Sequence, residues 1–277
     1  SQRSRCIGRQ AAEGRQLVLD LAPRFDVVAE NFKAGGLARL GLGYDDVAAV
    51  HPGVVYLSVS GFGNTTDSPY KDRPAFAAIV EAMSGIYDYQ ARDGKAPQAS
   101  PVGALGDISA ALFGAIGVLA ALRQKDRTGA GQYVDVAMLD ALIAMTDIVP
   151  NFWSMGLTEK APLILENFKA SDGWFVLQVG REPQFAALAA LVGCPEWLND
   201  DRLATRPGWV HHMDDVIRPG IEAWATGKTR QEAAAAMAAA GLASGPCLTD
   251  AEVVSDPHVE MRDMLVEMPR TDGIAQP

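Results

Sequence analysis

The chain has few cysteines, and it carries no clear signal for export. Cys6, Cys194 and Cys247 are an odd number, at spacings that match neither a CxxC pair nor a disulfide framework. We expect them to be buried small apolar side chains in a reducing compartment. No positively charged segment followed by an apolar run opens the chain. These absences together predict a cytoplasmic protein.

Common nucleotide, hydrolase and metal motifs are also missing. Gly227-Lys228-Thr229 resembles the end of a phosphate-binding P-loop, but Glu222 stands where the first glycine of that loop is required. No GxGxxG or GxSxG pattern occurs, which disfavours a dinucleotide oxidoreductase and an α/β-hydrolase. His211-His212 has no further histidine or carboxylate at clear ligand spacing. We therefore predict no metal site and expect this histidine pair to be exposed.

Positive charge and long apolar runs are scarce too. The chain has 24 Lys and Arg against 34 Asp and Glu, a net charge of -10 without long blocks of one sign, which disfavours nucleic acid as a partner. Any anionic ligand then needs a local cluster of basic side chains and backbone N–H groups. The longest uncharged apolar run, residues 108–122, is shorter than the roughly 18 to 20 residues that cross a bilayer. We predict that it forms a buried helix and that the protein has no membrane partner.

Apolar patterning over the first half of the chain predicts strands that alternate with helices. Such alternation indicates a parallel α/β layer. We expect strands at 26–30, 54–60 and 132–136, and helices at 11–24, 37–40, 44–50, 75–83, 107–124 and 139–153.

The pattern changes in the second half, where helices dominate. Two strands within 167–180 are predicted to meet at the turn Ser171-Asp172-Gly173. Two later helices open with capping boxes, Thr229 with Glu232 and Thr249 with Glu252. We predict a smaller α+β unit, with helices at 183–192, 218–225, 229–240 and 249–254.

Asp107 is the strongest candidate for a chemically reactive residue. It lies between a loop of small residues and an almost wholly apolar helix. A carboxylate there accepts hydrogen bonds from first-turn N–H groups and is kept ionised by the positive end of the helix. An ionised carboxylate in an apolar setting is a competent nucleophile. Aspartate is also among the commonest helix N-caps, so a structural role stays open.

An ordered set of segments resembles the class III CoA-transferases, the family of carnitine dehydratase and bile-acid-inducible protein F. The resemblance runs from about Ala11 to Val266. It implies a large Rossmann-like parallel-sheet domain plus a smaller α+β domain, in an interlocked homodimer. The segments that carry it are DVVAENF at 26–32, LGLGYDD at 40–46, YLSVSGFG at 56–63, AMSG at 82–85, GVLAAL at 117–122 and TGAGQYVDVAMLD at 128–140.

The resemblance also implies a domain organisation. Family members build the large domain from both ends of the chain, and this chain opens without Met. We therefore expect N- and C-terminal parts of the large domain to be missing. The implied divisions are a large α/β, CoA-binding domain at 1–156, a linker at 157–163, a small α+β domain at 164–262 and a return linker at 263–277.

The resemblance places Asp107 at the catalytic aspartate of the family. It implies an acyl-CoA:carboxylate CoA-transferase that works through aspartyl mixed anhydrides and an aspartyl-CoA thioester. Asn31, Phe32 and Lys33 match the turn that contacts CoA. No permanently bound cofactor is implied, because the CoA thioester is a substrate and a carboxylic acid is the acceptor.

Basic residues near that turn are candidates for the local positive cluster. Arg39 matches a family residue that meets the phosphates of the nucleotide, although on residue type alone a solvated helix face is the more frequent role. Lys71 and Arg73 are further candidates.

Two alternatives to CoA transfer stay open. The racemase branch of the family uses a histidine and an aspartate where this chain has Phe76 and Ala77, so acyl-CoA racemisation or epimerisation is the less favoured enzyme. A non-catalytic or incomplete subunit is the other alternative. The segment from Met155 to Asn167 has no tetraglycine loop of the formyl-CoA transferase kind, which disfavours oxalate and formate. The sequence leaves the donor and the acceptor acid open.

Overall fold

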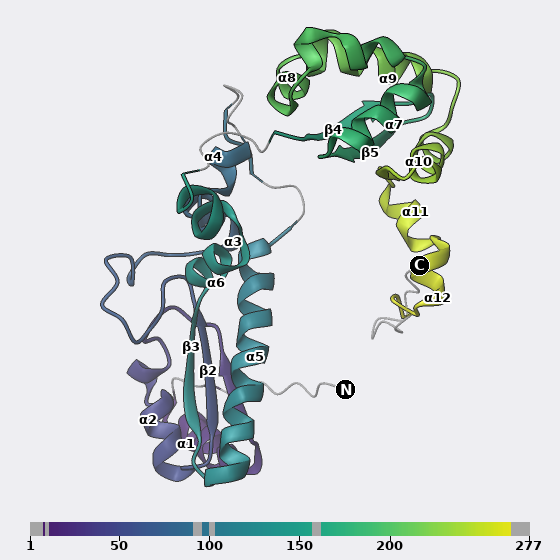
Figure 1. The fold of residues 1–277 in the computed structure, drawn as a ribbon. Coiled ribbons are helices and arrows are strands. Elements are labelled where there is room, and N and C mark those ends of the chain that lie inside the picture. Colours follow the sequence, from purple (N-terminus) through teal and green to yellow (C-terminus); the bar gives the residue numbers. More distant parts are fainter. Residues whose placement is uncertain (1–7, 9–10, 91–95, 100–102, 157–161, 267–277) are drawn as a thin grey trace. The chain divides into compact units, whose positions relative to one another are not determined.

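The computed structural model describes residues 8, 11–90, 96–99, 103–156 and 162–266 (Figure 1). The chain divides into two compact units, Ser1–Thr158 and Glu159–Pro277, and each is described by itself. Cys6, residues 157–161 of the expected linker and residues 267–277 of the expected return segment lie outside the described residues. The assignment of domain roles and linkers stays a prediction.

The first unit is built on a parallel sheet, which confirms the predicted α/β fold class. Strands β1 (Val27–Glu30), β2 (Val55–Ser60) and β3 (Gln132–Ala137) are adjacent in that order. Their register places Val28, Tyr56 and Tyr133 in one row, and Glu30, Ser58 and Asp135 in a second row two residues further along the strands. Because side chains alternate between the faces of a strand, both rows point to the same face of the sheet.

Helices cover both faces of this sheet (Figure 1). On one side lie α1 (Ala12–Leu21), the 3-10 turn η1 (Ala22–Arg24) and α2 (Tyr44–Val50). They enclose a small core with the sheet, made of Ala22, Val47, Val54 and Tyr56. The long helix α5 (Leu105–Thr128) packs on β2 and β3.

Helix α5 begins earlier than predicted. It starts at Leu105, with Ala104 at the N-cap, so Asp107 is inside the first turn. The structural alternative, in which Asp107 caps the helix, is therefore wrong. No Ser, Thr, Asp or Asn stands at this cap, so the local sequence carries no signal for a start at Leu105.

The prediction that α5 is buried is wrong for most of its apolar surface. Small residues form the contact face: a Cβ added at Gly114 would lie 3.2 Å from Leu57, and one at Gly117 would lie 2.7 Å from Val134. The helix can therefore lie close to the sheet with its small residues inward. Its large side chains point outward and are 51% to 67% exposed at Ile108, Leu112, Ile116 and Leu119.

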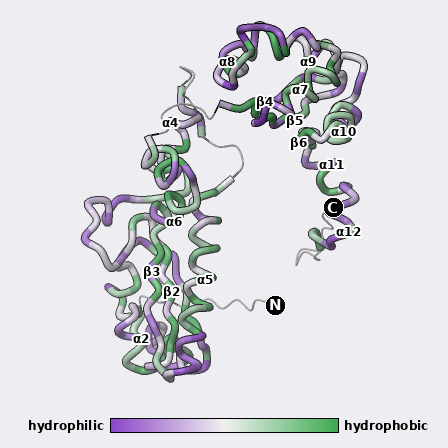
Figure 2. The backbone as a smooth tube through the Cα atoms, viewed as in Figure 1, coloured by the Kyte–Doolittle hydropathy of each residue, from purple (hydrophilic) through white to green (hydrophobic). Residues whose placement is uncertain are grey.

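By length and composition α5 could cross a membrane. It has 24 residues, a mean hydropathy of 1.9 in its most apolar window, and 28% of that window is buried. Figure 2 shows the mixture of apolar and neutral positions along it. Close packing on a sheet is the expected behaviour of a helix in an α/β layer, so these properties alone do not indicate a membrane span.

Short helices surround the carboxyl ends of the strands. They are α3 (Ala77–Met83), α4 (Ile86–Gln90), α6 (Met138–Met145) and the π-helical turn η3 (Ile148–Trp153). The helix predicted over 139–153 is interrupted, and Thr146 is extended. Pro150 explains the break, because it has no N–H to donate to residue 146 and its ring clashes with that carbonyl in an α-helix.

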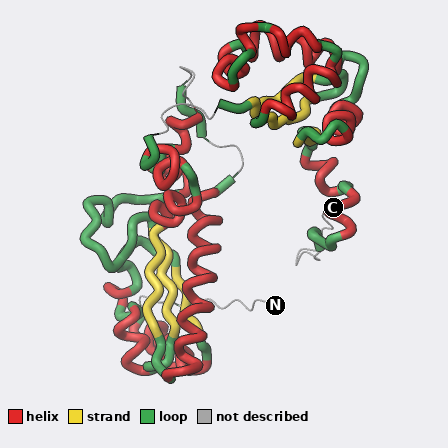
Figure 3. The backbone as a smooth tube through the Cα atoms, in the orientation of Figure 1, coloured by secondary structure: helices red, strands yellow, loops and turns green. Residues whose placement is uncertain are grey.

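The second unit is a three-stranded antiparallel sheet covered by helices (Figure 3). The strands are β4 (Ile164–Lys169), β5 (Trp174–Val179) and β6 (Ala243–Pro246), and the predicted turn at 171–173 joins the first two. Strand β6 was not predicted. The helices are α7 (Glu182–Val192), α8 (Arg206–His211), α9 (Arg218–Ala225), α10 (Arg230–Ala239), α11 (Asp250–Val254) and α12 (Pro257–Met261).

Short 3-10 and π-helical turns complete the chain. They are η2 (Ala38–Leu40) in the first unit and η4 (Pro195–Asn199), η5 (Asp201–Leu203) and η6 (Met213–Ile217) in the second. The core of the second unit is a single large cluster that includes Phe168, Phe175, Phe185, Trp197 and Trp209. Both predicted capping boxes form, at the starts of α10 and α11.

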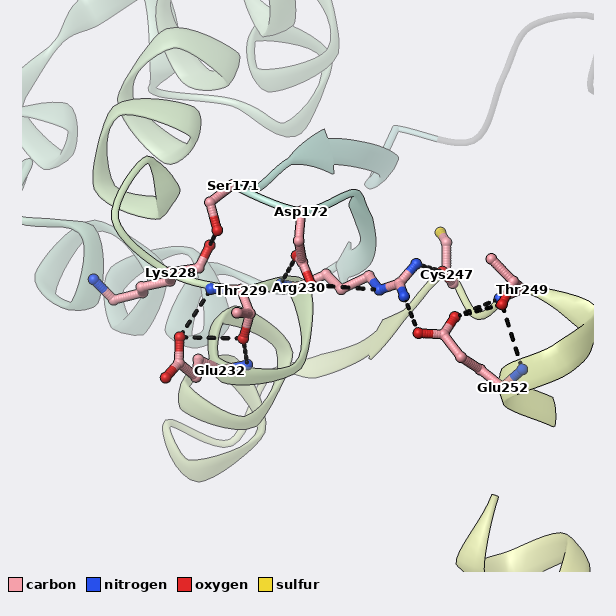
Figure 4. Close-up of polar contacts among 9 residues, drawn as sticks. All are labelled: Ser171, Asp172, Lys228, Thr229, Arg230, Glu232, Cys247, Thr249 and Glu252. Atoms are coloured by element: carbon pink, nitrogen blue, oxygen red, sulfur yellow. Dashed lines mark hydrogen bonds and ion pairs between the residues drawn. The ribbon is translucent and has the colours of Figure 1, made fainter. Parts of the chain in front are cut away.

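Arg230 joins three parts of the second unit (Figure 4). Its backbone N–H donates to Oδ1 of Asp172 at 2.7 Å, and its Nη1 donates to the carbonyl of Cys247 at 2.8 Å. Its Nη2 pairs with Glu252, the capping-box residue of α11. The side chain is only 13% exposed. Arg230, through its backbone N–H and its guanidinium, therefore ties the β4–β5 turn, α10 and α11 together.

Two expectations about isolated residues need correction. Cys194 is half-buried and Cys247 is exposed, so neither is a fully buried apolar side chain. His211 is exposed as expected, whereas His212 is half-buried, with Nδ1 3.0 Å from Asp215. Among the described residues no group of three or more His, Cys, Asp or Glu is placed to hold a metal ion.

We expect Arg230→Ala to destabilise the second unit by about 1–3 kcal/mol, because the carbonyl of Cys247 and the carboxylate of Glu252 lose a shared donor. The matched control is Arg202→Ala, which removes an exposed pair with Asp200 and should change stability by about 0.5 kcal/mol or less. Urea unfolding followed by tryptophan fluorescence measures both. Equal losses in the two variants would contradict the special role of Arg230.

Candidate active site

A cavity of about 460 Å³ lies at the carboxyl end of the parallel sheet. Open α/β sheets bind ligands at this edge, because the loops that follow adjacent strands meet there. Asn31, Phe32 and Lys33 line the cavity from the turn after β1, and Asp107 lines it from the first turn of α5. Four of the five predicted site residues thus share one cavity.

The fifth predicted residue, Arg39, lies behind the turn and does not line this cavity. Its Nη1 donates to the carbonyl of Ala34 at 3.4 Å, and its side chain is exposed. A Cβ at Gly35 would come within 3.1 Å of that guanidinium nitrogen. The glycine therefore leaves room for Arg39 to lie against the back of the turn.

The turn after β1 is held by its own hydrogen bonds. Oε2 of Glu30 accepts from the N–H of Phe32 at 2.7 Å, and the N–H of Gly36 donates to the carbonyl of Lys33 at 2.7 Å. The backbone of Gly35 has φ of 68°, in the left-handed region that glycine adopts without strain. These contacts fix the backbone of the turn and therefore the directions in which the side chains of residues 31–33 point.

A polar row across the sheet supports the same turn. Ser58 donates to Oε1 of Glu30, and the amide of Asn64 donates to Oδ1 of Asp135 at 3.2 Å. The carbonyl oxygen of Asn64 accepts from the N–H of Gly35 at 2.9 Å. Asn64 therefore connects the turn after β1 to strand β3. Burial raises the pKa of Glu30, and the charge of Asp135 acts in the same direction.

The polar row was not predicted as part of the site. The signal was present, because residues 30, 58 and 135 each end a predicted strand or lie near its end, at the edge where loops converge. What the sequence does not give is the register that aligns them. The row faces a second cavity of about 390 Å³, in which Tyr44 and Tyr133 stack with ring centroids 5.2 Å apart.

Basic side chains gather at the first cavity. Lys33, Lys71 and Arg73 line it, and Lys71 lines the second cavity as well. The guanidinium of Arg73 lies 4.4 Å from the centroid of the Tyr70 ring, a cation–π contact that restrains it. In a chain of net charge -10 this is the local positive cluster that an anionic ligand requires.

The first turn of α5 lies directly against α3. A Cβ at Gly106 would lie 2.6 Å from Cγ2 of Val80 and 3.1 Å from Cα of Ala77. Only glycine permits this approach without a shift. Asp107, the next residue, is exposed in this chain and is close to the first-turn N–H groups, which carry the positive end of the helix dipole.

Comparison with known proteins identifies the family of the chain. The family model for CoA-transferase family III matches residues 1–277. The chain belongs to CoA-transferase family III. It is 34% identical to succinyl-CoA–D-citramalate CoA-transferase of Chloroflexus aurantiacus, over 96% of this chain and 67% of that protein. It is 30% identical to succinate–glutarate CoA-transferase of Agrobacterium fabrum, over 96% of this chain and 67% of that protein.

Solved structures of the same family share the fold. The crystal structure of a CaiB/BaiF family protein from Brucella suis has a TM-score of 0.81 and 30% identity, and the match covers 98% of this chain and 75% of that one. The predicted family, and with it the class of enzyme, a transferase, is confirmed. The chain spans 60% to 69% of the length of these and other curated relatives.

We expect Gly106→Ala to lower the free energy of unfolding by about 1–3 kcal/mol, because the new methyl group must push α3 and α5 apart. Gly227→Ala is the control, since a Cβ there meets nothing within 4 Å. Thermal unfolding followed by circular dichroism compares the two variants. A loss at Gly106 no greater than that at Gly227 would contradict the close contact.

Proposed function

We propose that this chain transfers CoA from an acyl-CoA thioester to a carboxylate, with Asp107 as the nucleophile. The main support is that Asp107 lines the same cavity as Asn31, Phe32 and Lys33, the turn expected to hold CoA. The family resemblance gives roles to two segments that are about 75 positions apart in the sequence, and residues of both segments line this one cavity.

The chemistry begins with attack of an Asp107 carboxylate oxygen on the thioester carbonyl. A C–O bond forms, the C–S bond breaks, and CoA leaves as its thiolate, so the product is a mixed anhydride. The thiolate then attacks the aspartyl carbonyl, which releases the donor acid and leaves an aspartyl-CoA thioester. The acceptor carboxylate reverses these steps and departs as its CoA thioester. Asp107 is regenerated, and no proton is consumed overall.

The electrostatic environment of Asp107 suits these reaction steps. Each attack develops negative charge on a carbonyl oxygen, and N–H donors with the positive end of a helix dipole stabilise such charge. An anhydride also needs protection from water. Because Asp107 is exposed in a single chain, we propose that a second copy, interlocked as the family resemblance implies, completes the enclosure.

The basic cluster suits the two anionic substrates. We assign Lys33 and Arg39 to the phosphates of CoA, on the two sides of the turn. Lys71 and Arg73 are placed on the cavity wall, where they can attract a carboxylate. The names of the two curated relatives above contain dicarboxylates, so we propose a short dicarboxylate as the acid and a panel of such acids as the first assay.

Racemisation is less well supported. Phe76 lines the cavity, and its ring carries no group that exchanges a proton. Washing deuterium from solvent into the α-carbon of an acyl-CoA, without any exchange of the acid, would favour racemisation. A complete lack of both reactions in the full chain would favour the non-catalytic subunit.

Asp107→Asn should lower CoA transfer by at least about 10³-fold, because the amide cannot form the anhydride, while the fold and CoA binding persist. Asp126→Asn, an exposed carboxylate near the other end of α5, is the matched control and should retain full activity. Hydroxylamine trapping during turnover, with mass spectrometry, should locate the modification at Asp107. Modification of another residue would refute the assignment.

Lys33→Ala should raise KM for the acyl-CoA about tenfold, with a smaller effect on kcat, because a charge-assisted contact to a phosphate is lost in ground and transition states alike. KM for the acceptor acid should stay the same. Arg24→Ala, an exposed basic residue outside the cavity, is the control. An equal rise in KM for both variants would indicate a general charge effect.

A further inference from the structure

Glu81 is a buried carboxylate that the proposed chemistry does not use. It lies on α3 and is 2% exposed. Oε2 accepts a hydrogen bond from the Tyr87 hydroxyl at 2.7 Å, and Oε1 accepts from the backbone N–H of Gly106 at 3.4 Å. Burial of a carboxylate is costly unless hydrogen bonds compensate it. Through these two hydrogen bonds the Glu81 carboxylate links α3 to both α4 and α5.

The first turn of α5 needs an acceptor from outside the helix. The first four N–H groups of any helix have no partner within it. Ala104, at the N-cap, has no side chain that can accept from them. Glu81 reaches across from α3 to the N–H of Gly106, immediately before the proposed nucleophile. The missing Cβ of Gly106 is what lets α3 come close enough for this contact.

We propose that Glu81 is a positioning residue for Asp107. It holds the backbone of the first turn, so that the carboxylate of Asp107 and the remaining first-turn N–H groups keep a fixed direction toward the cavity. Misplacement of a reacting group by about 1 Å can cost about 10²-fold in rate. The inference rests on the proposed role of Asp107, and it assigns Glu81 no contact with substrate.

Two variants separate reach from charge. Glu81→Gln keeps the length of the side chain and an acceptor oxygen for Gly106, and its amide can donate to the Tyr87 oxygen. Glu81→Asp keeps the charge but is shorter by one methylene and cannot reach the N–H of Gly106. We expect kcat in Glu81→Gln to stay within about threefold of the wild type, and kcat in Glu81→Asp to fall about 10- to 100-fold at unchanged KM for the acyl-CoA.

A second measurement follows the backbone directly. Hydrogen exchange of residues 103–109 should be faster in Glu81→Asp than in the wild type and unchanged in Glu81→Gln, at equal folded fraction by circular dichroism. A role in stability alone would lower the unfolding temperature without changing kcat of the folded enzyme. Rate constants for formation of the aspartyl-CoA thioester in a single turnover should fall in parallel with kcat.

The outcomes distinguish this inference from the proposed function. Wild-type enzyme that transfers CoA, together with Glu81→Asp of unchanged kcat, would overturn the role of Glu81 alone. A loss of kcat in folded Glu81→Gln well beyond about threefold of the wild type would also overturn it, because this variant keeps both the reach and the acceptor oxygen; this outcome decides the question even if Glu81→Asp does not fold. Wild-type protein without transfer would refute the proposed function, while hydrogen exchange of residues 103–109 would still test the hold on the first turn.

Discussion

The close approach of α5 to its neighbours is the constraint on which the first unit depends. Gly106, Gly114 and Gly117 lie where a Cβ would meet α3, β2 or β3 at 3.2 Å or less. A helix that lies this near a sheet has little freedom to slide or rotate, because protein interiors are close-packed. The direction of its first turn, and hence of Asp107, follows from contacts spread along much of the helix.

The turn after β1, which forms another part of the cavity wall, is fixed by polar contacts instead. Asn64 joins the turn after β1 to Asp135 on β3, and Glu30 holds the N–H of Phe32. Hydrogen bonds are directional, so this wall is defined in orientation as well as distance. The two sides of the cavity thus depend on different forces: glycine packing sets the position of the proposed nucleophile, and a half-buried polar network sets the expected CoA turn.

Local patterns predicted most of the fold and little of the site. The strands of the first unit were predictable because buried parallel strands are runs of β-branched and apolar residues between turn signals. The start of α5 was not, since its N-cap residue has no capping side chain and the acceptor for the N–H of Gly106 is Glu81, 25 positions away. Apolarity could not tell which face of α5 packs inward, because the contact residues are the small ones. Asp107 and residues 31–33 were selected by family resemblance, and periodicity alone had left Asp107 with a structural role open.

Asp107 and an apolar stripe along α5 are both exposed in the single chain. Asp107 is exposed, and the large apolar side chains at 108, 112, 116 and 119 recur at the spacing of one helical face that continues along α5 from it. An anhydride that forms at an exposed position is open to hydrolysis. An apolar stripe of this length is likewise unfavourable in water. A second polypeptide that covers this surface would bury the apolar stripe and shield Asp107 from water. The proposed interlocked copy would do both with one interface.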